Sequence, residues 1–348
     1  MSVVKEMFSR KRILPLLLIM VLIVVWYMRQ PQPLVELHGT TFGTISYTIK
    51  YKDKQNRDFK TSVDSLLVVF NNAVSHYIPN SELSKFNKDS VITFSLPYLY
   101  PVLKASKQVY EKSAGGFNPA VMPLVNAWGF GPDKSMEPDS VTIDSLLKFT
   151  RFELVRFDSI QAWKLDKRLQ LDFSAVAKGQ GVDAVMLFLQ SKGIENVFVE
   201  IGGEVNARGT NAYGKPWKIG ILDPASDALN QSYIATVDLE NRAVATSANN
   251  FNYVIKEGVR YTHTIDPITG YPAHSRILSA SVFANDCMTA DAYATAFMVV
   301  GHEKAKEIAE SDPELEAFLV YSLPNGGIET YVTNGLKNVF YKQKGNDN

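Results

Sequence analysis

A carboxylate and a hydroxyl at helical spacing form the first candidate site in this sequence. Asp291 and Thr295 lie four residues apart in CMTADAYATAF, a segment predicted to be helical, so their side chains share one face. Two oxygen ligands on one face suit a hard cation such as Mg²⁺. The alternative is structural: Asp291 would favour the helix N-terminus through the helix dipole, and Thr295 would fill a surface position.

A second candidate site, for phosphate, follows Asp172 in LDFSAVAKGQG. The chain is predicted to pass here from a strand, in which Leu169 and Leu171 alternate, into a helix with Ser174 as its N-cap. Backbone N–H groups at a helix start attract phosphate, and Lys178 adds positive charge. The spacing of a Walker A loop is absent. Ordinary helix capping is the alternative.

A histidine beside a predicted turn is the third candidate. His263 lies in YTHTIDPITGYP, where Asp266, Pro267 and Gly270 occupy positions typical of a tight turn. Such a turn would hold the end of the preceding strand rigidly. A histidine titrates near neutral pH and can accept a proton from a hydroxyl. A purely structural histidine is the alternative.

An apolar segment with unusual composition, FNPAVMPLVNAWGFGPD, precedes the second candidate. Its proline and glycine content predicts an irregular loop, and a long apolar loop usually lines something. Phe117, Trp128 and Phe130 could form the wall of an aromatic ligand site. The alternative is a packed surface loop.

Hydrophobic periodicity predicts the elements that must position these residues. Helices are predicted at 63–74, from 98 to a stop at Gly115-Gly116, along a face made by Val182, Val185, Met186 and Leu189, at 288–301 with Gly301 closing it, and at 303–311. Strands are predicted at 44–51, 196–209, 217–222, 233–239, 243–247, 277–284, 316–322 and 327–332. Gly202-Gly203 interrupts the second of these, which indicates a bulge or a close backbone approach. Because strands mostly follow strands, we expect an α+β fold with mainly antiparallel sheets.

Composition narrows the function classes. Of 348 residues, 46% are hydrophobic and 21% charged, which is ordinary for a globular protein with a core. Lys plus Arg equals Asp plus Glu at 36 each, and no basic stripe appears, so we expect no nucleic-acid partner. The single cysteine, Cys287, excludes an intramolecular disulfide and a cysteine-based zinc site.

The N-terminus reads as a membrane anchor. A basic flank at residues 1–12 precedes an uncharged apolar run at 13–28 and a short linker at 29–36. The run is followed by no small-residue cleavage site and no lipoprotein cysteine. Basic flanks stay in the cytoplasm, so we expect an uncleaved, single-pass signal anchor in the inner (cytoplasmic) membrane, with the rest of the chain on the periplasmic side. A buried core helix is the alternative.

Nine motifs in a fixed order resemble the ApbE family, the FAD:protein FMN transferases, over roughly residues 37–345. They are HGTTFGT, SHYIPNSELSKFN, GGFNPAVMPLVNAWGFG, LDFSAVAKGQGVDAV, EIGGEVNARG, PWKIGILDP, AVATSANNFNY, YTHTIDPITGYP and CMTADAYATAFMVVG. The resemblance implies a duplicated T-fold-like α+β domain at 37–345. It also implies Mg²⁺-dependent transfer of FMN from FAD to a serine or threonine of a target protein, with release of AMP. Implied targets are subunits of Na⁺-pumping NADH:quinone reductase or of Rnf-type complexes.

The resemblance also implies roles for individual residues. Asp291, Thr295 and the backbone carbonyl of Ala175 match metal ligands, and His263 matches the catalytic histidine. The positions that match flavin-nucleotide contacts are Phe42, Tyr77, Gly116, Phe117, Asn118, Asp172, Lys178 and Ile265. Three positions depart from the family pattern: Phe42 replaces a common methionine, Asn118 a common aspartate, and Ala294 a second acidic ligand of some members.

Two other functions use the same residues. One is a metal-dependent FAD pyrophosphatase, in which water replaces the protein hydroxyl and free FMN and AMP form. The other is a membrane-tethered flavin-binding protein without enzymatic activity. The metal and histidine positions argue against the second, because storage of FAD needs no cation on its diphosphate.

Overall fold

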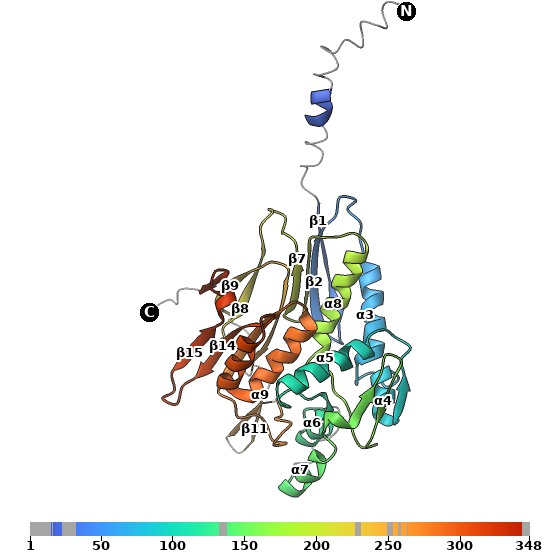
Figure 1. The fold of residues 1–348 in the computed structure, drawn as a ribbon, viewed down its shortest axis with the longest axis vertical. Coiled ribbons are helices and arrows are strands. Elements are labelled where there is room, and N and C mark those ends of the chain that lie inside the picture. Colours follow the sequence, from blue (N-terminus) through green and yellow to red (C-terminus); the bar gives the residue numbers. More distant parts are fainter. Residues whose placement is uncertain are drawn as a thin grey trace, which may run out of the picture.

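An eight-stranded antiparallel sheet forms the centre of the molecule (Figure 1). The computed structural model describes residues 15, 17–22, 33–131, 138–226, 231–248, 253–256, 259–262 and 264–342. In spatial order the strands are β1 (Leu34–Thr41), β2 (Ile45–Lys52), β6 (Val197–Ile201), β7 (Glu204–Arg208), β10 (Arg242–Ala248), β13 (Ile277–Ala284), β14 (Glu316–Ser322) and β15 (Ile328–Val332). The predicted α+β class with mainly antiparallel sheets is confirmed.

Alternate residues of the sheet strands enter two different cores, as the two-residue period of a strand requires. In β14, Phe318 and Val320 belong to the core shared with a small second sheet, whereas Ala317, Leu319 and Tyr321 belong to the core under the helices. The small sheet consists of β8 (Trp217–Leu222), β9 (Tyr233–Leu239) and β16 (Phe340–Lys342). The central sheet is therefore buried on both faces at β14, whereas alternate residues of the edge strand β1 are exposed.

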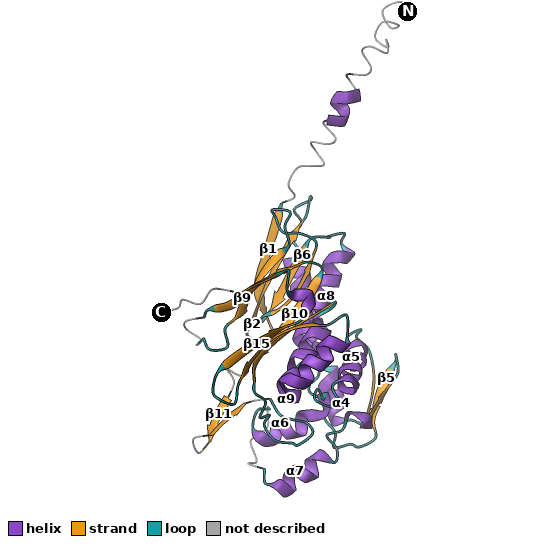
Figure 2. Cartoon of the chain, turned by 60° about the vertical axis from the view of Figure 1, so that its left-hand side comes forward, coloured by secondary structure: helices purple, strands orange, loops and turns teal. Residues whose placement is uncertain are grey.

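Helices cover the face of the central sheet opposite the small sheet (Figure 2). They are α3 (Lys60–Val74), α5 (Leu99–Lys112), α8 (Ala177–Ser191) and α9 (Cys287–Ser311). The predicted apolar face of α8, formed by Val182, Val185, Met186 and Leu189, is buried. Gly301 leaves helical geometry at φ 82° and ψ 166°, so the two helices predicted around it are the two halves of α9.

Smaller elements complete the described chain. They are α4 (Glu82–Lys88), β3 (Val91–Thr93), η1 (Pro119–Val121), α6 (Met122–Trp128), α7 (Ser140–Leu147), η2 (Phe152–Leu154), β4 (Val155–Phe157), β5 (Gln161–Lys164), β11 (Tyr253–Lys256), β12 (Val259–Thr262) and η3 (Asn334–Leu336). Strands β3, β5 and β4 form one further sheet, and β11 pairs with β12.

A buried carboxylate connects α8, β7 and α9. Asp183 of α8 accepts hydrogen bonds from the side chain of Asn206 on β7 at 2.7 Å and from the backbone N–H groups of Cys287 and Met288 at 2.9 Å each. Those two N–H groups begin α9 and have no partner within the helix. The position of α9 on α8 and β7 is thereby fixed.

Four local predictions were wrong. Residues 119–128 are largely helical, because proline is tolerated in the first turn of a helix, where Pro119 and Pro123 lie. Gly202-Gly203 does interrupt the predicted strand, but it forms no bulge. It is the two-residue turn between β6 and β7, with φ 62° and 99°, as tight hairpin turns require.

The third wrong prediction was the strand ending at Asp172. Leu171 is buried, but the side-chain amide of Asn87 bonds both its N–H, at 2.7 Å, and its carbonyl, at 2.8 Å, in place of a strand partner. Ser174 is likewise not an N-cap, because α8 begins later, after Val176, with no side-chain cap.

The predicted membrane segment at 13–28 lies mostly outside the described residues. Of that segment only residues 15 and 17–22 are described, as exposed helix. No helix within the described part of the chain is long and apolar enough to cross a membrane.

Candidate active site

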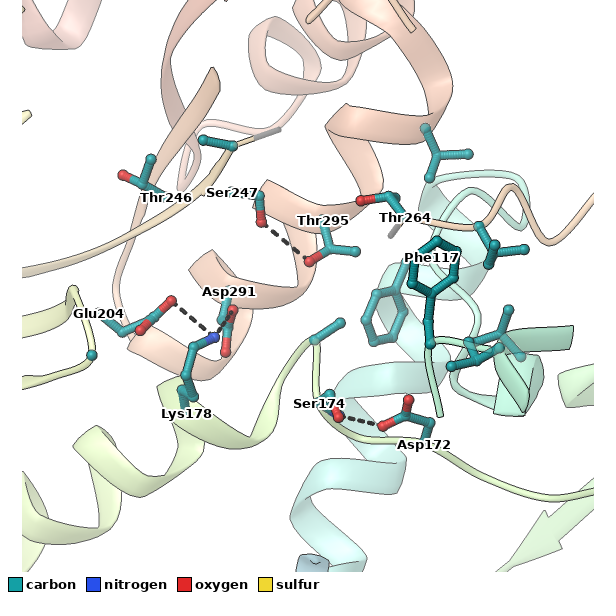
Figure 3. A pocket seen from close by; sticks show the side chains of 18 of the residues that line it. Phe117, Asp172, Ser174, Lys178, Glu204, Thr246, Ser247, Thr264, Asp291 and Thr295 are labelled. Atoms are coloured by element: carbon teal, nitrogen blue, oxygen red, sulfur yellow. Dashed lines mark hydrogen bonds and ion pairs between the residues drawn. The ribbon is translucent and has the colours of Figure 1, made fainter. Parts of the chain in front are cut away.

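A cavity of about 890 Å³ lies where α8, α9, β10 and the segment 116–131 meet (Figure 3). Its size is at the upper end of the range of roughly 300–1,000 Å³ that is usual for small-molecule sites. Ten of the predicted site residues line it: Tyr77, Gly116, Phe117, Asn118, Asp172, Ala175, Lys178, Ile265, Asp291 and Thr295. Motifs far apart in the sequence therefore form one site.

Three charged side chains meet at one side of the cavity. The Lys178 ammonium lies 3.0 Å from Glu204 Oε1 and 3.6 Å from Asp291 Oδ1 (Figure 3). The other oxygen of Asp291, Oδ2, accepts a hydrogen bond from the N–H of Gly179 at 3.0 Å. Each side chain comes from a different element, α8, β7 or α9, and Asp183 holds these three elements together.

Burial and charge act in opposite directions on this cluster. Burial disfavours the ammonium of Lys178, but Asp291 and Glu204 outweigh that effect and raise the pKa of Lys178 above its ordinary value. Burial raises the pKa of Glu204, and the nearby lysine only partly opposes it. Lys178 is therefore a permanent positive charge inside the cavity at neutral pH.

Other residues with oxygen atoms that could bind a hard cation line the cavity together with Asp291. The Thr295 hydroxyl lies one helical turn along α9 and 3.3 Å from the Ser247 hydroxyl, and Ala175 lines the same cavity. Within the described residues no three His, Cys, Asp or Glu side chains gather as a metal site. The donor set is one carboxylate with hydroxyl and carbonyl oxygens, which fits Mg²⁺ because Mg²⁺ is usually bound by one or two carboxylates together with substrate phosphates.

A second carboxylate at the cavity is held by a histidine. His76 Nδ1 lies 3.3 Å from Asp172 Oδ1, which also accepts the N–H of Ser174 at 2.7 Å. Burial opposes the charge on Asp172, yet these two partners outweigh it and lower its pKa. The ring of Tyr77 packs on His76 with centroids 4.0 Å apart, and Tyr77 is 65% exposed. Asp172 is thus an ionised acceptor for a ligand hydroxyl or N–H.

The opposite wall of the cavity is apolar. Phe117, Phe130 and Ile265 line it, whereas Trp128 is absent from the described lining. Trp128 donates from Nε1 to the carbonyl of Gly270 at 2.8 Å, and its ring contacts Tyr271. Two of the three predicted aromatic residues therefore face the cavity, and the third supports the turn behind it.

That turn has the predicted construction. The Asp266 side chain accepts the N–H of Ile268 at 2.8 Å and the hydroxyl of Thr269 at 2.9 Å, and the Gly270 N–H closes on the Asp266 carbonyl at 2.8 Å. Thr264, just before the turn, lines the cavity. His263 itself lies outside the described residues, between Thr262 at the end of β12 and Thr264.

The three departures from the family pattern have distinct surroundings. Phe42 is not among the described lining residues; it sits at φ 48° between β1 and β2 and packs edge-on against Phe70. Asn118 caps η1 by accepting the N–H of Ala120 at 2.8 Å, which an aspartate would do equally well. Ala294 is fully buried in α9.

Two site residues were missed by the sequence analysis. His76 precedes Tyr77 in a polar loop and carries no signal of its own. Glu204 carried one: a charged residue directly after Gly202-Gly203, at the start of the strand EVNAR, which also contains Asn206 and Arg208. A charge at a buried strand position is rarely tolerated without a partner, which points to a role.

Comparison with known proteins gives consistent matches. The ApbE family model matches residues 42–319. A Vibrio cholerae protein named FAD:protein FMN transferase is 36% identical over 321 residues, 88% of this chain and 93% of that protein. A Haemophilus influenzae protein of the same name is 33% identical over 311 residues, 84% of this chain and 88% of that protein. The solved structure titled flavin transferase ApbE from Vibrio cholerae has a TM-score of 0.78 at 34% identity and covers 89% of this chain and 100% of that chain.

Proposed function

The chain belongs to the ApbE family and is a transferase, and we propose that it moves FMN from FAD to a serine or threonine hydroxyl of a target protein, releasing AMP. The observation that carries the proposal is the cavity in which Asp291, Thr295 and Lys178 converge opposite an apolar wall. A dinucleotide needs both parts, because its rings are apolar and its diphosphate is charged. The relatives' shared name supports flavin transfer from FAD.

Different residues of the cavity would bind different parts of FAD. Phe117, Phe130 and Ile265 would contact a ring system. Lys178 would attract the diphosphate, because it stays charged when buried. Asp172 would accept a hydrogen bond from ribose or base.

Cation binding belongs to the same proposal. Asp291, Thr295 and the carbonyl of Ala175 would hold Mg²⁺, which when bound neutralises negative charge on the diphosphate. Oxygen donors of this kind line the cavity.

The proposed reaction is a substitution at phosphorus. The target hydroxyl oxygen forms a bond to the FMN phosphorus, and the bond between that phosphorus and the AMP oxygen breaks. AMP leaves with the electron pair, and His263 takes the hydroxyl proton. Lys178 lies beside the charge that grows during this exchange.

We also propose that the chain is tethered to the inner membrane through residues 13–28, with the transferase domain on the periplasmic side. The uncharged run after a basic flank supports this orientation. Flavin-carrying subunits of Na⁺-pumping NADH:quinone reductase or Rnf-type complexes are the proposed targets.

The decisive test mixes the detergent-solubilised full chain with FAD, Mg²⁺ and the flavin-carrying domain of an Rnf-type subunit. We expect the acceptor mass to rise by one FMN, and the gain to vanish when EDTA replaces Mg²⁺. An unchanged acceptor with accumulating FMN and AMP would instead identify a pyrophosphatase. Intact FAD that remains bound would identify a flavin-binding protein.

His263→Ala should lower the transfer rate by roughly 10²–10⁴-fold, the usual contribution of a general base. FAD affinity should remain, because the diphosphate and ring contacts are made by other residues. Single-turnover transfer and FAD binding by fluorescence quenching measure the two effects separately. Full flavinylation by the variant at neutral pH would exclude His263 as the base.

A further inference from the structure

Glu204 is a buried charged residue for which the proposed mechanism has no use. It begins β7, is 3% exposed and lines the cavity. Its Oε1 lies 3.0 Å from the ammonium of Lys178, while its Oε2 is buried without a hydrogen-bond partner among the described residues. An unpaired buried carboxylate oxygen is costly, so a partner is expected to reach it in some state of the site.

Lys178 occupies the place that a cation would need. Its ammonium lies 3.6 Å from Oδ1 of Asp291, and the other Asp291 oxygen already accepts the N–H of Gly179. A divalent cation bound at Oδ1 would face this ammonium at short range in a buried site, where like charges repel strongly. The lysine must therefore move when the cation binds.

Glu204 provides an alternative acceptor for the ammonium of Lys178. Lys178 has three N–H donors and needs to give up only the longer of its two contacts, the one to Asp291. The unpaired Oε2 of Glu204 can accept a hydrogen bond from an N–H group of Lys178 that turns away from Asp291. Figure 3 shows the lysine side chain between the two carboxylates, so the required movement is small.

We propose that Lys178 and a divalent cation compete for Asp291 in the empty cavity. Glu204 is a positioning residue that draws Lys178 away from Asp291 when the cation binds. The inference rests on the proposed cation site at Asp291 and Thr295. Before the cation binds, Lys178 bridges the two carboxylates and offsets part of their negative charge. Afterwards Glu204 alone keeps the ammonium beside the cavity, where it can meet the diphosphate.

The test uses Mn²⁺ alone as the probe, without FAD or acceptor, and measures free Mn²⁺ by electron paramagnetic resonance during titration of the full chain. Lys178→Met should tighten Mn²⁺ binding by at least about tenfold, because a competing charge 3.6 Å from the proposed ligand oxygen of Asp291 is removed. Lys107→Met on α5 is the matched control. That lysine is exposed and pairs at 3.9 Å with Glu111, so its loss should leave Mn²⁺ affinity unchanged.

Glu204→Gln should weaken Mn²⁺ binding several-fold in the parent, because Lys178 then stays on Asp291. In the Lys178→Met background the same change should have a clearly smaller effect, since the residue on which it acts is gone. An equal loss in both backgrounds would show that Glu204 acts on the metal directly and would overturn the positioning role. Unchanged or weaker Mn²⁺ binding by Lys178→Met would exclude competition between Lys178 and the cation for Asp291.

Two controls separate this inference from the proposed function. Circular dichroism melts of each variant establish that it is folded. If no variant binds Mn²⁺, the cation site at Asp291 is itself wrong, whereas the acceptor-mass assay reports flavin transfer independently of this titration.

Discussion

Asp291→Asn should reduce FMN transfer by at least about a thousandfold, which corresponds to roughly 4 kcal/mol of lost transition-state stabilisation. Asp291 is the only carboxylate among the residues proposed to hold the cation. Asparagine has nearly the same shape and can still accept the N–H of Gly179, which is 3.0 Å from Oδ2 in the parent. The change therefore removes the charge and keeps the fold.

The control for this variant lies on the same helix. Asp286 caps α9 by accepting the N–H of Thr289 at 2.8 Å, and asparagine is an equally good cap. Asp286→Asn should therefore keep both stability and transfer. Single-turnover transfer at saturating FAD and Mg²⁺ measures both variants. Transfer by Asp291→Asn within tenfold of the parent would place the metal elsewhere.

Local periodicity was enough to predict most of the fold. The apolar face of α8 and the strands of the central sheet other than β1 follow from spacing within single segments. The break at Gly301 also follows, because only glycine readily adopts φ 82°. Such features depend on neighbours a few residues away.

Features that depend on distant partners could not be predicted in the same way. Leu171 reads as a strand residue, but its backbone groups bond the side chain of Asn87, 84 positions earlier. Pro119 and Pro123 read as helix breakers, although each lies in a first turn, where it costs little. The effect of a proline depends on its position within a helix, and composition alone does not give that position.

In the functional site, too, some residues could be predicted from the sequence and others depend on distant partners. Ten of the residues that line the cavity were identified through motif order, which single spacings could not have done. Glu204 escaped because its partner, Lys178, lies on another element. Pairing across elements is a tertiary property, and the sequence indicates only that a buried charge requires some partner.

Gly179→Ala should be the most destabilising small substitution near the site. Gly179 lies in α8 where it crosses α9, and a Cβ there would overlap the carbonyl group of Cys287 and lie 2.9 Å from Cβ of Asp291. Backbone cannot rotate away as a side chain can, so the helices must separate. Such overpacking costs typically about 1–3 kcal/mol, and occasionally more, against a gain of about 1 kcal/mol from alanine's helix propensity.

The cost of separating α8 from α9 should exceed that gain, because the Gly179 N–H would also lose its bond to Asp291. A net loss of about 2 kcal/mol lowers the melting temperature by roughly 3 °C in a domain of this size. Gly181→Ala, two residues along α8, is the matched control: its Cβ would meet the ring of Phe42 at 3.0 Å, and a side chain can shift. In thermal unfolding, Gly181→Ala should have a melting temperature near that of the parent, whereas Gly179→Ala should melt at a lower temperature and lose FMN transfer. Equal melting temperatures of the two variants would mean that α8 and α9 are not in backbone contact at this crossing.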